Sequence, residues 1–467
     1  MRVNHVCQVI PSGFSHKPRI LHLSRLPRPA RVGPTQQLAS MDYASTLPLE
    51  VLLKIFRGLT PPNWESVRDL CAAACVCPSW RDAAKEPSLC RELYVFKAPL
   101  NARLTGPRLQ NLVARSRNTL TWLELDGCPL VREPALTRSL HTQPWLIFVS
   151  VTGCALVTCP GLAYALCDSE SFQGVVKQLN DPRQSAADAQ RCCVALRVLL
   201  LLDVMKVQEG EAALAEAQAA GVLDALLRCA ALHVARAGVQ TACCFALSQY
   251  VYAAQDTEDA SFPSVFQAAA AALKAHPSDA DVHEAALMAL RNACCFGLEG
   301  TPGVPALLDA IPLVLAALRA FPTHLTVQKY GCLSLTKMCK MDASVVEAVA
   351  AAGAMGLFIK ALNLDFTNDA TCVAALEAIG AIALSPAALP QASACIGAVV
   401  RALRRHTNSE FAEATCKTLG IYLRCSATRE QAQHLSADFV ITAAASTHNK
   451  DAKVKKAAKD ALKDPQA

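Results

Sequence analysis

The chain has 467 residues, 52% of them hydrophobic and only 5% aromatic, enough for two or three domains or one elongated array of repeats. Its net charge of +6 comes entirely from residues 1–40, which hold six basic and no acidic residues. The rest of the chain balances 39 basic against 39 acidic residues, which excludes the charge signature of a nucleic-acid-binding protein. No apolar run reaches about 18 uncharged residues, which argues against a membrane protein.

Residues 1–40 form a basic leader. Arginine without acidic residues is typical of transit peptides, but five prolines interrupt any amphipathic helix in this segment. We therefore expect a disordered leader, or sequence upstream of a start at Met41, in preference to an organellar targeting peptide.

Residues 45–95 have the pattern of three short helices. Pro48 suits the first turn of a helix, and the apolar residues after it recur at steps of three and four, so they share one helix face. A second apolar-periodic segment ends near Val76, and a third helix opens at Pro78 and Trp80. Helices this short bury little surface alone, so the unit needs a partner or a neighbouring domain.

This segment resembles an F-box, the module that joins a protein to SCF-type ubiquitin ligases. The resemblance rests on Leu47-Pro48-Leu49-Glu50, on Ile55-Phe56, and on Val76-Cys77-Pro78-Ser79-Trp80. It implies binding to an SKP-type adaptor, and through it to a cullin scaffold. The implied contact residues are Leu47, Pro48, Ile55, Phe56, Val76 and Trp80.

Residues 96–170 contain short repeats. The segment at residues 123–128 recurs 26 residues later at residues 149–154, and a degenerate copy begins at Leu93. Alternation places Leu123 and Leu125 on one face of a short strand, and Leu140 fits the helix that follows. These copies resemble the cysteine-containing leucine-rich repeats that often follow F-boxes. Because they are few, we expect them to form a bridge rather than an independent horseshoe.

From residue 172 to 467 the chain is alanine-rich and repeats over a longer period. A small residue followed by an apolar one recurs at steps of 51, 43, 45, 44, 40 and 43 residues. The pairs are Ala195-Leu196, Ala246-Leu247, Ala289-Leu290, Ser334-Leu335, Ala378-Ile379, Thr418-Leu419 and Ala461-Leu462. This spacing is in the range of armadillo and HEAT repeats, and the segments that begin at Gly221 and Gly353 resemble the turn into an armadillo second helix. The last helix, rich in lysine, is expected to cap the array.

The 22 cysteines do not follow the spacing of a disulfide framework or a zinc site. Several stand two residues before a small–apolar pair, as Cys193, Cys244, Cys332 and Cys416 do, so we interpret them as small buried residues of a reducing compartment. The expected location is the cytoplasm, the nucleus or both. No P-loop, zinc-protease helix or nucleophile elbow is present, so the sequence predicts no catalytic residue, no cofactor and no metal.

In armadillo proteins, an asparagine on the third helix of each unit commonly holds an extended peptide, and Asn292 matches that position here. The corresponding positions in the other repeats lack asparagine, so a full ladder is not expected. Gln249, Arg291, Asn292 and Lys337 are the candidate substrate-binding residues, and ordinary solvated helix positions are the alternative interpretation.

The sequence thus predicts a mostly α protein with an F-box-like module, a leucine-rich-repeat α/β bridge and an armadillo/HEAT-like α-solenoid. The function implied by resemblance is that of a non-catalytic adaptor that holds an unknown protein substrate for ubiquitin transfer, with neither nucleic acid nor membrane as a partner. The alternative is a ligase-independent scaffold or transport adaptor whose N-terminal helices only cap the solenoid.

Overall fold

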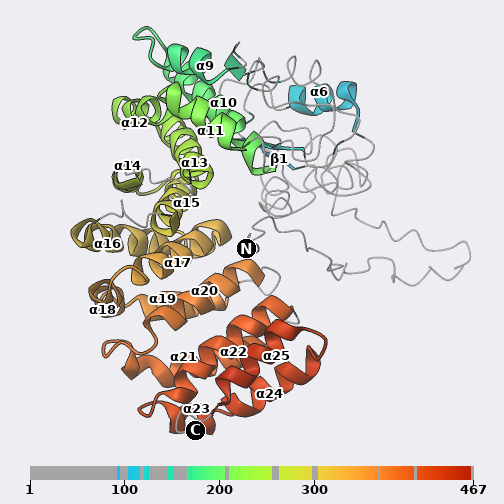
Figure 1. The fold of residues 1–467 in the computed structure, drawn as a ribbon, viewed down its shortest axis with the longest axis vertical. Coiled ribbons are helices and arrows are strands. Elements are labelled where there is room, and N and C mark those ends of the chain that lie inside the picture. Colours follow the sequence, from blue (N-terminus) through green and yellow to red (C-terminus); the bar gives the residue numbers. More distant parts are fainter. Residues whose placement is uncertain are drawn as a thin grey trace, which may run out of the picture. The chain divides into compact units, whose positions relative to one another are not determined.

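The computed structural model describes residues 171–205, 210–254, 262–296, 303–364, 369–403 and 408–463, together with short stretches and single residues between 92 and 169. The chain divides into one unit of residues 1–46 and a second of residues 47–467. All described residues belong to the second unit, in which helices dominate and form an α-solenoid (Figure 1).

Three short parallel strands precede the solenoid: β1 (Glu92–Tyr94), β2 (Trp122–Glu124) and β3 (Phe148–Ser150), with helix α6 (Gly106–Arg115) after β1. The sheet register places Leu93 opposite Leu123, and Leu123 opposite Val149. These are equivalent positions of the three sequence copies, so residues that recur in sequence lie side by side in the sheet. Leu123 and Leu125 are both fully buried, as the alternation predicts.

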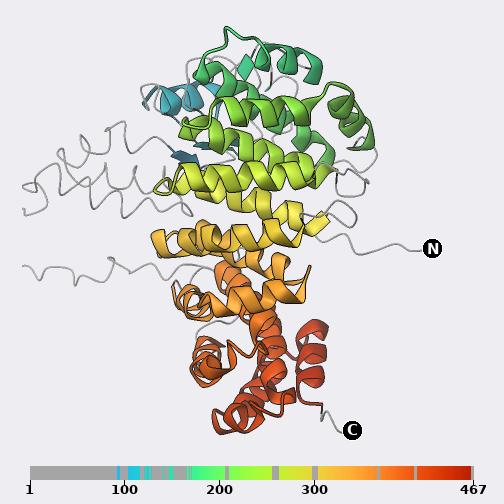
Figure 2. The same ribbon diagram turned by 90° about the vertical axis from the view of Figure 1, so that its left-hand side faces the viewer.

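The solenoid has two main layers of helices, which Figure 1 shows side by side and Figure 2 shows from the side. One layer, here called the third-helix layer, consists of α10 (Ala186–Met205), α13 (Ala237–Ala253), α15 (Ala280–Phe296), α17 (Leu325–Cys339), α20 (Asp369–Ile382), α22 (Ser409–Arg424) and α25 (Ala452–Ala461). The second layer consists of α12 (Val222–Leu232), α14 (Phe262–Ala275), α16 (Val304–Ala320), α19 (Ala354–Leu362), α21 (Ala392–Leu403) and α24 (Ala437–Thr447). Shorter helices lie between them in the chain: α9 (Phe172–Leu179), α11 (Gly210–Ala219), α18 (Ala343–Ala351), η3 (Leu389–Gln391) and α23 (Arg429–His434).

Every small–apolar pair predicted from the sequence lies at or beside a helix of the third-helix layer. Their side chains are buried, apart from Leu462, which is 43% exposed just after the terminal helix. In two repeats the small residue also bonds to the preceding helix of the layer. The Ser334 hydroxyl lies 2.9 Å from the Leu287 carbonyl, and the Thr418 hydroxyl lies 3.2 Å from the Leu376 carbonyl. Small side chains therefore allow these helices to approach closely enough for a hydroxyl to reach the neighbouring backbone.

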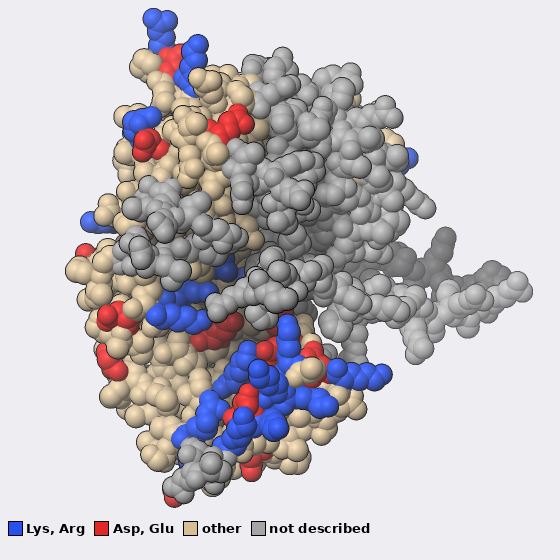
Figure 3. All heavy atoms as spheres, in the orientation of Figure 1, with Lys and Arg blue, Asp and Glu red and all other residues tan. Residues whose placement is uncertain are grey.

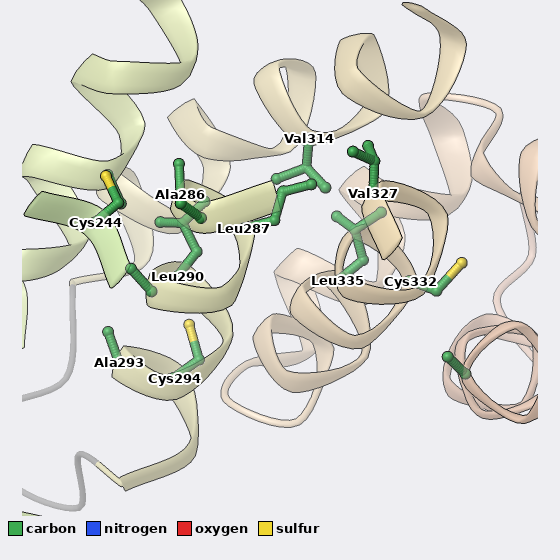
Figure 4. Close-up of a cluster of buried hydrophobic side chains, with 14 of the residues drawn as sticks. Cys244, Ala286, Leu287, Leu290, Ala293, Cys294, Val314, Val327, Cys332 and Leu335 are labelled. Atoms are coloured by element: carbon green, nitrogen blue, oxygen red, sulfur yellow. The ribbon is translucent and has the colours of Figure 1, made fainter. Parts of the chain in front are cut away.

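The core between these helices is built from alanine, leucine, valine and cysteine. Figure 4 shows Cys244, Cys294 and Cys332 among such side chains on the successive helices α13, α15 and α17. Described cysteines are free thiols, and all but Cys295 and Cys425 are buried. Their burial agrees with their interpretation as packing residues.

Several turns into the second-layer helices use left-handed backbone. Gly221 and Gly353 have φ of 69° and 77° immediately before α12 and α19, a conformation that glycine adopts without steric cost. These are the glycines that the sequence places at the turn into a second helix. Ser436 takes the same conformation before α24, with φ of 62°.

Helix α10 joins the sheet to the solenoid. The buried side chains of Gln190 and Arg197 donate hydrogen bonds to the carbonyls of Leu146 and Val149, at 3.1 and 3.2 Å. The two donors are seven residues apart, about two turns, so they lie on one face of α10. They satisfy backbone acceptors at and beside β3, which fixes this strand against the first long helix of the solenoid.

In the part of the chain that the structure describes, no single helix has the length and apolar character to span a membrane. Helices α18 and α19 would reach that length only together, and they are bent by 78° where they meet.

Candidate protein-binding surface

The four residues predicted to bind substrate lie on three consecutive helices of the third-helix layer. Gln249 is on α13, Arg291 and Asn292 are on α15, and Lys337 is on α17. The solenoid therefore brings residues that are 88 positions apart in sequence onto neighbouring helices.

Asn292 is engaged within the fold. Its side chain is only 5% exposed, and its amide nitrogen donates to the carbonyl and the hydroxyl of Ser248, at 3.0 and 2.8 Å. Its amide oxygen accepts a bond of 2.7 Å from Arg291. Asn292 thus ties α15 to α13, and it could hold a peptide backbone only by giving up Ser248. Its predicted role in substrate binding stays a prediction.

Gln249 and Arg291 offer donors that the fold does not use. The side-chain amide nitrogen of Gln249 and the Nε of Arg291 are shielded from solvent and have no hydrogen-bond partner among the described residues. Both residues are only partly buried overall. Buried donors without a partner are costly, so a side-chain rotation that brings either donor to an acceptor on a bound chain would be favourable.

A further cation, Lys329, lies near these residues and was not singled out from the sequence. Burial lowers its pKa, and the positive charge of Arg291 lowers it further. The ammonium lies 5.3 Å from the centre of the Tyr330 ring, and burial raises the pKa of that tyrosine to about 12. Lys329 precedes Lys337 by eight residues, slightly more than two helical turns, and this spacing is the signal that could have identified it.

A cavity of about 470 Å³ opens between α17, α20 and α22. Its apolar lining includes Val373, Leu376, Ala381, Ala414 and Ile421. Its charged lining consists of Lys340, Glu377, Glu410, Glu413 and Lys417. The volume lies in the range of about 300–1,000 Å³ that is usual for ligand sites, and the mixture of apolar and charged groups suits side chains of a bound peptide.

Lysine and arginine side chains gather over α22 and α25 on the face shown in Figure 3. Helix α25 buries Val454, Ala457, Ala458 and Ala461 against its neighbours. Its lysines are exposed: Lys453, Lys455, Lys456 and Lys459, with Lys463 just beyond. Helix α25 thus has one apolar face packed on the solenoid and one charged face, the pattern that terminal capping repeats show.

The residues predicted to contact an SKP-type adaptor (Leu47, Pro48, Ile55, Phe56, Val76 and Trp80) lie outside the described residues. Comparison with known families nevertheless addresses this segment: residues 44–95 match the model of the F-box-like family. This segment is an F-box-like domain.

One curated relative is named as an F-box protein. An F-box protein of Arabidopsis thaliana is 30% identical over 106 residues, which is 22% of this chain and 28% of the relative. The chain thus spans little more than a quarter of the relative's length.

Among solved structures, the crystal structure of an engineered protein is similar over 89% of this chain and 99% of its own, with 18% identity and a TM-score of 0.52. A structure from a study of the interaction between cadherin and beta-catenin aligns over 90% of this chain and 97% of its own, at 14% identity and a TM-score of 0.40. The first similarity supports the solenoid fold alone, and the second is too low to carry an argument.

Proposed function

We propose that this chain is the substrate-recruiting adaptor of an SCF-type cullin–RING ubiquitin ligase. The observation that carries the proposal is the F-box-like domain at residues 44–95, because F-box domains in general bind an SKP-type adaptor. In this proposal Leu47, Pro48, Ile55, Phe56, Val76 and Trp80 form the adaptor contact.

The target protein would bind on the third-helix layer. Gln249 and Arg291 supply donors without partners among the described residues, Lys329 and Lys337 supply positive charge, and the cavity between α17, α20 and α22 supplies an apolar anchor. These features lie on successive helices, so an extended segment of a target could contact several of them at once.

The bonds of Gln190 and Arg197 support a fixed geometry between the sheet that follows the F-box-like domain and the solenoid that would hold the target. They hold β3 against α10, so that the sheet after the F-box-like domain and the start of the solenoid act as one body. The chain would contribute proximity and orientation to ubiquitin transfer while other subunits supply the chemistry. We place this action in the cytoplasm or the nucleus, where thiols such as those of the solenoid core stay reduced.

Affinity purification of the full chain from its native cells under proteasome inhibition, with two variants, tests both halves of the proposal. The double variant Leu47→Ala/Pro48→Ala should lose the SKP-type adaptor and the cullin but keep the target. Lys337→Glu should lose the target but keep the adaptor. Lys274→Glu, the same change at an exposed lysine of α14 in the other layer, should keep both.

The proposal is wrong if a folded Leu47→Ala/Pro48→Ala variant retains the adaptor at wild-type level. Target capture without any adaptor by the wild type would favour a ligase-independent scaffold. Equal loss of the target from Lys337→Glu and Lys274→Glu would contradict the placement of the target site on the third-helix layer.

A further inference from the structure

Three buried cysteines from three different helices meet in the core of the first solenoid repeat. Cys193 comes from α10, Cys229 from α12 and Cys243 from α13, and none is more than 3% exposed. The sulfur of Cys193 lies 3.8 Å from that of Cys229 and 3.3 Å from that of Cys243. All three sulfur atoms lie within 4.8 Å of one another.

These separations are close to those of three sulfur ligands around one metal ion. A metal–sulfur bond of about 2.3 Å places two sulfur ligands about 3.8 Å apart around a tetrahedral ion and about 4.0 Å apart around a trigonal one. The Cys193–Cys229 separation already matches the tetrahedral value, and the Cys193–Cys243 separation would have to lengthen by about 0.5–0.7 Å to reach either value. Two thiols in contact can be ordinary core packing. Three sulfur atoms that point to one place could all bind the same metal ion.

We propose that Cys193, Cys229 and Cys243 form a binding site for a single Cu(I) ion. Soft thiolate ligands select soft ions such as Cu(I) and Zn(II). Structural zinc sites are almost always four-coordinate, and the described residues add no fourth histidine, cysteine or carboxylate to this group. Three thiolates in a water-excluded core therefore favour Cu(I) over Zn(II).

The surroundings allow the thiols to become ligands. Binding requires the sulfur atoms to lose their protons, which pass to solvent as the metal enters. Cys193 already shares hydrogen bonds with Cys229 and with Cys243, so a metal ion would replace protons that lie between these sulfur atoms. The buried guanidinium of Arg197 stands one helical turn after Cys193 and lies over the Phe245 ring, 5.6 Å from its centre. It supplies a buried positive charge on the same helix as Cys193.

Sequence spacing could not reveal this site. The three cysteines are separated by 36 and 14 residues and form no C-x-x-C pair, so the sequence predicts no metal. Only the stacking of α10, α12 and α13 brings their sulfur atoms together.

The test offers one equivalent of Cu(I) to the reduced full chain under anaerobic conditions, in competition with the chromogenic chelator bicinchoninate. The wild type should withhold about one equivalent, and copper-edge X-ray absorption should show three sulfur neighbours. Cys193→Ser and Cys243→Ser should each weaken retention by roughly tenfold or more, since even outer-shell changes at metal sites cost that much. Cys244→Ser, which alters the equally buried neighbour of Cys243, should retain copper as the wild type does. This control shows whether losing a buried cysteine outside the triad also lowers copper retention.

Equal copper retention by the wild type and a folded Cys193→Ser variant would overturn the proposal and leave the triad as core packing. Stoichiometric Zn(II) retention at the same thiols in preference to Cu(I) would overturn the choice of metal. If the variants do not fold, the wild type alone decides, because a ligand that binds only the folded state must raise the unfolding temperature. Cu(I) at one equivalent should raise it, and no shift would refute the site.

Discussion

The fourth residue of four successive third-helix-layer helices makes the same contact in each repeat. Gln240 donates to the Ala230 and His233 carbonyls, and Gln328 donates to the Leu318 and Phe321 carbonyls. His283 and Cys372 occupy the matching positions and reach the carbonyls of His276 and Leu362. Each side chain satisfies carbonyls at the end of the preceding second-layer helix, where intrahelical partners run out. This position therefore fixes the turn between the two layers.

His283 makes this contact sensitive to pH. Burial lowers its pKa below the ordinary value, and its Nδ1 is buried without a partner among the described residues. The folded state thus resists protonation, whereas an unfolded histidine binds a proton below about pH 6.5. Stability contributed by neutral His283 is present above that pH and is lost as the pH falls through it.

We expect His283→Gln to reduce this pH dependence while keeping the contact, because glutamine makes it in the repeats on either side. Its unfolding temperature at pH 7.5 should stay close to that of the wild type, within about 1 kcal/mol of stability. Between pH 7.5 and 5.5 it should fall less than the wild-type value. His434→Gln, at an exposed histidine, is the control, and an unchanged pH dependence in His283→Gln would count against the mechanism.

At the scale of the elements, close packing of the third-helix layer depends on residues with little or no side chain. A Cβ built on Gly420 of α22 would lie 2.7 Å from the Cβ and 2.8 Å from the Cα of Ala461 on α25. Backbone at that distance cannot move aside as a flexible side chain can. The terminal helix is therefore held at a separation that only glycine permits.

Gly420→Ala should destabilise the C-terminal end of the solenoid by about 1–3 kcal/mol, since overpacking forces the two helices apart. Faster hydrogen exchange in α25 would report this change. Gly356→Ala in α19 is the matched control, because its added Cβ meets nothing within 4 Å, and it should be neutral or stabilising by up to about 1 kcal/mol. Equal effects of the two substitutions would contradict the packing argument.

The elements also show what periodicity can and cannot predict. Leu93, Leu123 and Val149, which recur in sequence, are paired in the sheet, and the small–apolar pairs mark the helices of the third-helix layer. Periodicity identifies equivalent positions, but it does not say which side chains from different repeats touch. The engagement of Asn292 with Ser248 and the meeting of Cys193 with Cys243 depend on the stacking of separate helices, so neither could be read from spacing.

At the scale of the whole molecule, the proposed adaptor function assigns ligase coupling to the F-box-like domain and target binding to the helical solenoid. The F-box-like domain occupies residues 44–95, and the solenoid begins near residue 172. Between them, the parallel sheet is bonded to α10 through Gln190 and Arg197. In the proposed function, a target on the third-helix layer would therefore be held on the same body as the sheet that follows the F-box-like domain.

Direct binding of a purified SKP-type adaptor to the full chain is the measurement that tests this account most directly. Co-elution with multi-angle light scattering should show a complex of one adaptor per chain. Leu47→Ala/Pro48→Ala should abolish that complex and leave the helical circular dichroism and the unfolding temperature of the solenoid unchanged. Failure of a well-folded wild type to bind the adaptor, or equal binding by the double variant, would contradict the assignment of residues 44–95 as the ligase-coupling domain.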